Sequence, residues 1–332
     1  MLAGRIRTGS VVRPAAGCAR LASGPVDAIP LGDSGLSVSR IVVGAAREPV
    51  PVARGVQLLH EAWDLGVRGV DVTDGARARE TAAQSFLDDR QPEDAVLMAA
   101  VGVPVDPERG SDLSPSRTER GVAGRAQRLG RLDAVWLRGT DADTPAEATV
   151  TALAAAMDEG TIRAWGAGEA DVRVLESWLL AADRAGLPRP AFARTRWNLL
   201  EREAEEDLLA LAFGEDVAVL PVGVYASGRL GDRHIAAADE AERAVAKGAA
   251  RTVPEEPRLE PLLVLRDLAR ERGVSTGALA LAWLLAHPAN PAPVVPAVPG
   301  PGWDAVPEAL EAARELDEEA WSRIDELFTL EP

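Results

Sequence analysis

Short apolar segments alternate with longer amphipathic segments along most of this chain. Eight segments have the length and apolar character of buried strands: residues 41–43, 69–73, 96–101, 132–137, 162–166, 191–195, 217–222 and 294–298. Between them, apolar residues recur at helical spacing, as Leu59, Ala62 and Trp63 do. Strict alternation predicts an all-parallel sheet covered by helices, and eight units favour a closed (β/α)8 TIM barrel over an open sheet.

Other segments flank or interrupt this pattern. Residues 31–40 are typical of a hairpin with a glycine-containing turn. A long polar segment, 226–257, precedes the helices expected at 259–272 and 276–286, and two more helices follow the last strand. We therefore expect one α/β domain over residues 29–332, a barrel with an N-terminal hairpin and C-terminal extra helices.

Residues 1–28 carry four arginines against one aspartate, with small residues between them. No continuous apolar core of signal-peptide length is present. This composition favours a disordered or weakly ordered extension over a targeting peptide.

Composition argues against several classes of protein. The net charge of -16 argues against nucleic-acid and anionic-membrane binding, because both need clustered cations. The single cysteine, Cys18, excludes an internal disulfide, and no metal-ligand spacing occurs. No apolar run reaches the roughly 18 residues of a membrane span. A cytoplasmic protein is expected.

Two carboxylates, Asp71 and Asp74, follow a buried strand and precede a glycine turn at Gly75. The carboxyl ends of the strands are where (β/α)8 barrels hold their active sites. Asp71 is therefore a candidate catalytic residue, provided that neighbouring strands supply partners.

Five segments resemble the aldo-keto reductase family, and together they span about residues 30–328: 31–40, 69–74, 159–166, 198–202 and 279–285. The segment around Tyr225 is similar to the aldose 1-dehydrogenase branch of that family. The resemblance implies NADPH-dependent carbonyl reduction by an Asp, a Tyr acting as general acid, a Lys that lowers the pKa of that Tyr, and a His. A phenol with a pKa near 10 needs such a neighbouring cation to exchange protons at neutral pH.

Only the Asp of this tetrad is retained, as Asp71. The positions that match the Tyr, the Lys and the His hold Ala76, Ala100 and Arg138. No Tyr precedes Tyr225 and no Lys precedes Lys247, so no shift in alignment restores the tetrad.

The positions that the resemblance assigns to the cofactor have changed as well. Gly168 and Glu169 stand where the family has a Ser-Asn pair that holds the nicotinamide, and Arg194 replaces its Gln. The phosphate-binding stretch corresponds to residues 299–304, and no Lys or Arg occurs between residues 273 and 313. No cofactor is therefore expected, and NADP(H) only if the chain is an oxidoreductase.

Alternate strands contribute to the same interior layer, so Asp71 and Arg138 are expected to approach each other, with Arg194 adding a second cation. One interpretation is a pocket for a small carboxylate or phosphate. Its candidate ligand-binding residues are Asp74, Arg138, Arg194, Trp197 and Tyr225. The simpler interpretation is that Arg138 and Asp71 neutralise each other at a former active site.

Two functional hypotheses follow, and they leave open whether the chain is an enzyme. The first is a degenerate, non-catalytic barrel that acts as a small-anion-binding or regulatory subunit, with a protein partner or as a homo-oligomer. The alternative is a divergent NAD(P)H-dependent oxidoreductase for a carbonyl or sugar aldehyde, in which Tyr225, a water or the substrate supplies the proton. His287 is expected at a helix end, where an imidazolium suits the helix dipole.

Overall fold

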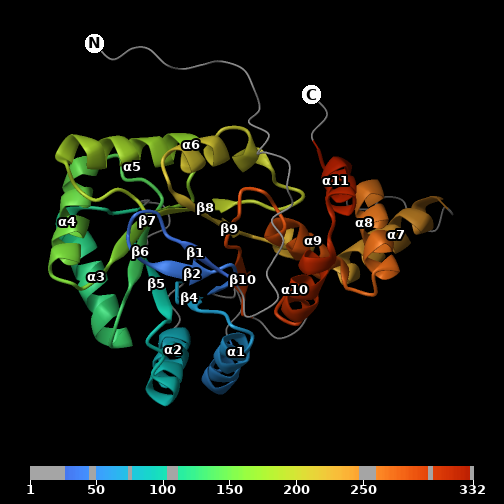
Figure 1. Cartoon of the computed structure of the whole chain (residues 1–332), viewed down its shortest axis with the longest axis horizontal. Helices are drawn as coiled ribbons and strands as arrows, with labels where there is room; N and C mark the ends of the chain where they lie inside the picture. Colours follow the sequence, from blue (N-terminus) through green and yellow to red (C-terminus); the bar gives the residue numbers. More distant parts are fainter. Residues whose placement is uncertain are drawn as a thin grey trace, which may run out of the picture.

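The computed structural model describes residues 27–44, 50–73, 77–102, 111–246, 259–297 and 302–329. Eight parallel strands form a nearly closed barrel with helices around it, as the sequence predicts (Figure 1). The strands are β3 (Val42–Gly44), β4 (Gly69–Asp71), β5 (Val96–Val101), β6 (Ala134–Arg138), β7 (Ala164–Gly168), β8 (Phe192–Arg196), β9 (Ala218–Val222) and β10 (Val294–Pro296). They pair in the order β10-β3-β4-β5-β6-β7-β8-β9. Where the two ends of this order, β9 and β10, come together, the Ala292 N–H donates to the Val219 carbonyl at 2.9 Å.

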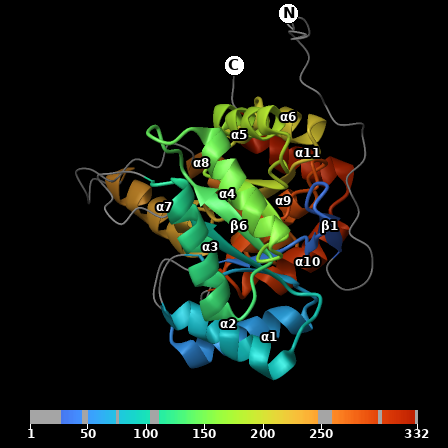
Figure 2. The same cartoon turned by 90° about the vertical axis from the view of Figure 1, so that its left-hand side faces the viewer.

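The helices surround this sheet in chain order (Figure 2). They are α1 (Val52–Asp64), α2 (Arg77–Arg90), α3 (Pro115–Leu129), α4 (Ala146–Asp158), α5 (Val172–Ala185), α6 (Leu208–Gly214), α7 (Asp232–Ala246), α8 (Leu259–Glu271), α9 (Thr276–Leu285), α10 (Ala305–Glu315) and α11 (Glu318–Leu327). Short 3-10 turns are η1 (Glu203–Glu205) and η2 (Ala226–Gly228), and the expected hairpin consists of β1 (Ala28–Pro30) and β2 (Ser37–Ser39). None of the helices in the described ranges is long and apolar enough to cross a membrane.

Two predicted elements differ from those observed. The segment expected to be a long polar loop contains helix α7, which includes His234; Lys247 lies outside the described residues. Between the strands predicted at 191–195 and 217–222 the alternation predicts one helix, but the structure has η1 followed by the short helix α6, with Asp207 between them in a non-helical conformation.

The hydrophobic residues form two separate cores. One lies between the sheet and the helices, and the other fills the barrel interior above the hairpin. Inside the barrel, large side chains face glycines. A Cβ on Gly166 would lie 2.5 Å from the Phe192 ring, so β7 stays small where β8 is large. This interdigitation fills the interior and fixes the layer on which the site is built.

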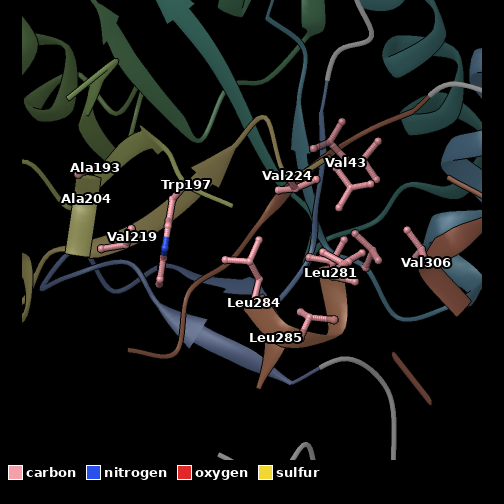
Figure 3. Packing of buried hydrophobic residues seen from close by; sticks show 14 of the residues in the cluster. Val43, Ala193, Trp197, Ala204, Val219, Val224, Leu281, Leu284, Leu285 and Val306 are labelled. Atoms are coloured by element: carbon pink, nitrogen blue, oxygen red, sulfur yellow. The ribbon is translucent and has the colours of Figure 1, made fainter. Parts of the chain in front are cut away.

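An aromatic cluster joins β8 to the C-terminal helices. Trp197 follows β8 and lies among core residues such as Leu284 of α9 (Figure 3). The ring centroid of His287 lies 4.7 Å from that of Trp197, 5.6 Å from Trp283 and 5.5 Å from Trp321. The Ala289 N–H donates to His287 Nδ1 at 3.1 Å. The expectation of an imidazolium at a helix end is therefore wrong, because the ring is 8% exposed and accepts a hydrogen bond.

Burial, together with the nearby Arg202 guanidinium, lowers the pKa of His287 to about 3. The unfolded state takes up a proton on His287 as the pH falls through about 6.5, whereas the folded state does so only near pH 3. The neutral His287 therefore costs the folded state no stability above pH 6.5, and stability is lost as the pH falls from 6.5 toward 3. We expect His287 to cost about 2 kcal/mol of unfolding free energy between pH 7 and pH 5.

Urea unfolding at several pH values tests this expectation. His287→Asn should show a flatter decline in unfolding free energy below pH 6.5 than the wild type. Parallel slopes for wild type and His287→Asn would contradict the lowered pKa.

Candidate functional site

The carboxylate of Asp71 lies inside the barrel at the end of β4, and the side chain is 2% exposed. Its Oδ2 is 2.9 Å from Nη2 of Arg194 on β8. Its Oδ1 accepts hydrogen bonds from the N–H of Thr73 at 3.0 Å, from the Thr73 hydroxyl, and at 3.5 Å from the Trp136 indole N–H. Both oxygens of this buried carboxylate are therefore engaged by the protein's own donors.

Trp136 on β6 contacts both Thr73 and Arg194. Its indole N–H donates to the Thr73 hydroxyl oxygen at 3.0 Å, and the Arg194 guanidinium lies 3.8 Å from its ring centroid. Gly168 also lies against this ring, since an added Cβ there would be 2.1 Å from the indole. The ring thus occupies the space that any side chain at position 168 would need, and its electron-rich face attracts the buried guanidinium.

The expected ion pair between Asp71 and Arg138 is wrong, since Arg194 pairs with Asp71 and Arg138 faces Glu169, with Nε 3.4 Å from Oε1. The strand register gives the reason. Asp71 pairs with Met98, which in turn pairs with Ala134. In a barrel of eight strands and shear 8, a layer climbs about one residue per strand, so the Asp71 layer meets β6 at Trp136. Arg138 lies one layer nearer the opening.

Among the described strand residues, three arginines project near the mouth of the barrel, Arg138, Arg194 and Arg196, and each contacts a carboxylate. Arg79 of α2 also reaches this region, where its guanidinium donates to the Thr73 carbonyl at 3.3 Å. Besides the buried Asp71–Arg194 pair, the solvent-accessible pairs are Arg138–Glu169 and Arg196–Glu201, whose atoms are 3.4 Å and 3.3 Å apart. The two accessible pairs contribute little stability. The mouth is polar but has equal numbers of strand arginines and carboxylate partners, which does not favour a pocket selective for small anions.

Tyr225 lies in a different part of the carboxyl-terminal face. Its hydroxyl donates to the Gly302 carbonyl at 2.7 Å, and its ring is 3.6 Å from where a Cβ on Gly277 would lie. Burial raises the pKa of the Tyr225 phenol. A phenol whose pKa is raised and whose proton is held in a hydrogen bond is unsuited to general-acid catalysis near neutral pH.

The remaining candidate residues lie away from the Asp71 layer or outside the described residues. Trp197 lies in the aromatic cluster, 0% exposed, where its indole N–H donates to Glu205 at 2.8 Å. Asp74, Ala76 and residues 298–301 lie outside the described residues. Sequence reasoning missed Thr73 and Trp136, although residues at even spacing from Arg138 on the same strand face the interior. No group of three or more metal-binding side chains occurs within the described residues.

Comparison with known proteins identifies the family of this barrel. Relatives include a "Probable voltage-gated potassium channel subunit beta" from Oryza sativa subsp. japonica, 28% identical, with 78% of this chain and 83% of the relative covered. An Arabidopsis thaliana protein of the same name is also 28% identical, with the same coverage. "Versiconal hemiacetal acetate reductase" from Aspergillus parasiticus is 24% identical, with 78% of this chain and 85% of the relative covered. A model of the Aldo/keto reductase family matches residues 40–328, and this chain belongs to that family.

Proposed function

We propose that this chain is a non-catalytic aldo/keto reductase-family barrel that acts as a partner subunit for another protein. The observation that carries this proposal is the interior layer formed by Asp71, Arg194 and Trp136. Carbonyl reduction needs a proton donor beside the carbonyl, with a pKa close to the working pH. In this layer the carboxylate is held by an arginine, which does not release its proton in proteins, and by an indole.

The side chains in place do not fit a nicotinamide cofactor in the way that the family resemblance implies. The positions expected to hold the nicotinamide amide are Gly168 and Glu169. The Trp136 ring fills the space that a side chain at position 168 would need, and Glu169 contacts Arg138. The expected Gln is Arg194, which is paired with Asp71. Tyr225 ties the Gly302 carbonyl, in the stretch expected to bind phosphate, to the end of β9. We derive no hydride-transfer step for this chain.

The names of two relatives support a partner role. The rice and Arabidopsis proteins are named as channel β subunits, which are components of protein assemblies, whereas the Aspergillus relative is named as a reductase. The family thus includes proteins of both kinds, and the interior layer favours the first for this chain.

Calorimetric titration of the full chain with NADPH and with NADH tests the proposal. We expect no heat of binding up to millimolar cofactor, and no cofactor oxidation with a panel of aromatic and sugar aldehydes. An active reductase of the family, measured in the same buffers, controls for the assay. Micromolar binding with turnover of any of these aldehydes would overturn the proposal and support the oxidoreductase alternative.

A further inference from the structure

Helix α6 has the composition of a buried helix. Its seven residues are three leucines, two alanines, Phe213 and Gly214, without one polar side chain. A helix that is apolar on all sides ordinarily lies inside a protein, whereas a surface helix has polar residues on its outer side. Yet α6 lies at the outside of the barrel, next to α5 (Figures 1 and 2), and only Leu208 and Ala212 are buried. Contacts among the described residues therefore do not account for the composition of α6.

The exposed residues of α6 form one face. Ala210, Phe213 and Gly214 are all exposed, and their spacing of three and four residues places them on the same side of the helix. Phe213 is 82% exposed, whereas the other three phenylalanines of the chain are 2% exposed or less. A Cβ added to Gly214 would meet no atom of the described residues within 4 Å, apart from its own helix and chain neighbours. These three residues, which we call the α6 face, leave an aromatic ring uncovered.

Acidic residues flank the α6 face at both ends. Residues 203–216 contain six carboxylates and no Lys or Arg. Two of the six are paired with arginines outside this range: Arg202 is 2.6 and 2.7 Å from the carboxylate of Glu205, and Arg189 Nη1 is 2.8 Å from that of Glu215. The other four are exposed and form no ion pair within the described residues: Glu203, Glu206, Asp207 and Asp216. The surroundings of the α6 face are therefore acidic.

The acids that follow α6 do not stabilise the helix. Glu215 and Asp216 come directly after its C-terminal end, where the helix dipole is negative and a carboxylate is unfavourable. The whole chain carries a net charge of -16, so a second copy of this chain would be repelled from this acidic region. The surface that complements the α6 face instead has bulky apolar side chains at its centre and Lys or Arg around them.

We propose that the α6 face binds a segment of a partner protein in which bulky apolar side chains are flanked by Lys and Arg. Phe213 is the anchor, since a buried aromatic side chain contributes more to binding than most residues of an interface. The exposed carboxylates of Glu206 and Asp216, one before and one after the helix, attract the cations of the partner segment and orient it along α6. This inference rests on the proposed partner role, for which it supplies the contact surface.

Fluorescence anisotropy of the full chain with a labelled peptide tests this contact. The probe is a synthetic peptide with a Leu-Phe-Leu centre and two Lys residues on each side, and the same peptide with Glu in place of Lys is the charge control. We expect the Lys peptide to bind in the micromolar range, and more weakly at raised ionic strength, because exposed charges attract it. The Glu peptide should not bind.

Two matched pairs of variants locate the binding. Phe213→Ser should raise the dissociation constant at least about tenfold, whereas Leu180→Ser, at an exposed apolar residue of α5, should leave it unchanged. Glu206→Gln/Asp216→Asn should weaken binding several-fold, whereas Glu311→Gln/Glu315→Gln, the same change of charge on α10, should not. Far-UV circular dichroism should show the same helix content in all variants, because every replaced side chain is exposed.

No binding of the Lys peptide at millimolar concentration would overturn the inference, as would equal weakening by the test variants and their controls. Self-association of the wild type that is lost in Phe213→Ser would assign the face to a second copy and overturn it as well. Peptide binding that begins only when Arg5, Arg7, Arg13 and Arg20 are all replaced by serine would instead assign the face to residues 1–26 of the chain itself.

These results are separate from the cofactor titration. A chain that binds neither the Lys peptide nor NADPH would lose this contact surface and keep the non-catalytic assignment. A chain that turns over aldehydes with NADPH would lose the proposed function, whether or not the Lys peptide binds.

Discussion

Replacing Arg194 by methionine is expected to lower the free energy of unfolding by about 3–5 kcal/mol, because it leaves Asp71 as a buried carboxylate without its cation. The side chain of Asp71 is 2% exposed and that of Arg194 is 11% exposed, so water cannot substitute for either partner. Asp71→Asn should cost a similar amount, since it leaves the guanidinium buried. The loss of the guanidinium from the Trp136 ring adds to the effect of the arginine substitution.

The double variant Asp71→Asn/Arg194→Met separates the pair from its packing. Asparagine keeps an acceptor for the Thr73 N–H, and methionine keeps much of the arginine stem, so the double variant should lie within about 1–2 kcal/mol of the wild type. Urea unfolding followed by circular dichroism measures all three variants. Arg54→Met is the matched control: its pair with Glu61 is also 2.9 Å long, but the side chains are 30% and 39% exposed. It should cost less than about 1 kcal/mol. Costs of that size for the Asp71 and Arg194 single variants would contradict a desolvated pair.

The fold was predictable from the sequence because its signals are local. Strand length, helical spacing and alternation of the two specify a parallel barrel without any knowledge of contacts. Helix α7 was missed for the same reason. Its 15 residues are mostly alanine and charged residues, with Ile235 as a large buried apolar side chain, so its periodicity is weak.

The candidate site was predictable only as a set of positions. The motifs place Asp71, Arg138 and Arg194 at the barrel mouth, but which arginine meets the carboxylate depends on the register between strands, and a layer climbs as the strands tilt. The burial of His287 could not be predicted either, because the tryptophans around it come from the segment after β8 and from α9 and α11, which are far apart in the chain. Such contacts follow from tertiary packing, and no local pattern encodes them.

Arg202 is expected to be as important for the C-terminal helix as Arg194 is for the barrel interior. Its guanidinium is 2.6 Å and 2.7 Å from the two carboxylate oxygens of Glu205, 2.7 Å from Asp325 Oδ1 and 2.9 Å from the Asp325 carbonyl. The Trp283 indole N–H also donates to Asp325 at 3.2 Å. This group joins η1, α9 and α11, with the Arg202 side chain 9% exposed.

Arg202→Leu should therefore lower the unfolding free energy by about 3–5 kcal/mol, because two largely desolvated carboxylates lose their shared cation. Hydrogen exchange should show α11 opening before the barrel, since Asp325 is its link to Arg202. Arg323→Leu, at an exposed position of the same helix, should change stability by no more than about 0.5 kcal/mol. Equal exchange in α11 for wild type and Arg202→Leu would mean that the aromatic contacts of Trp321 with Trp283 and His287 hold the helix without the ionic group.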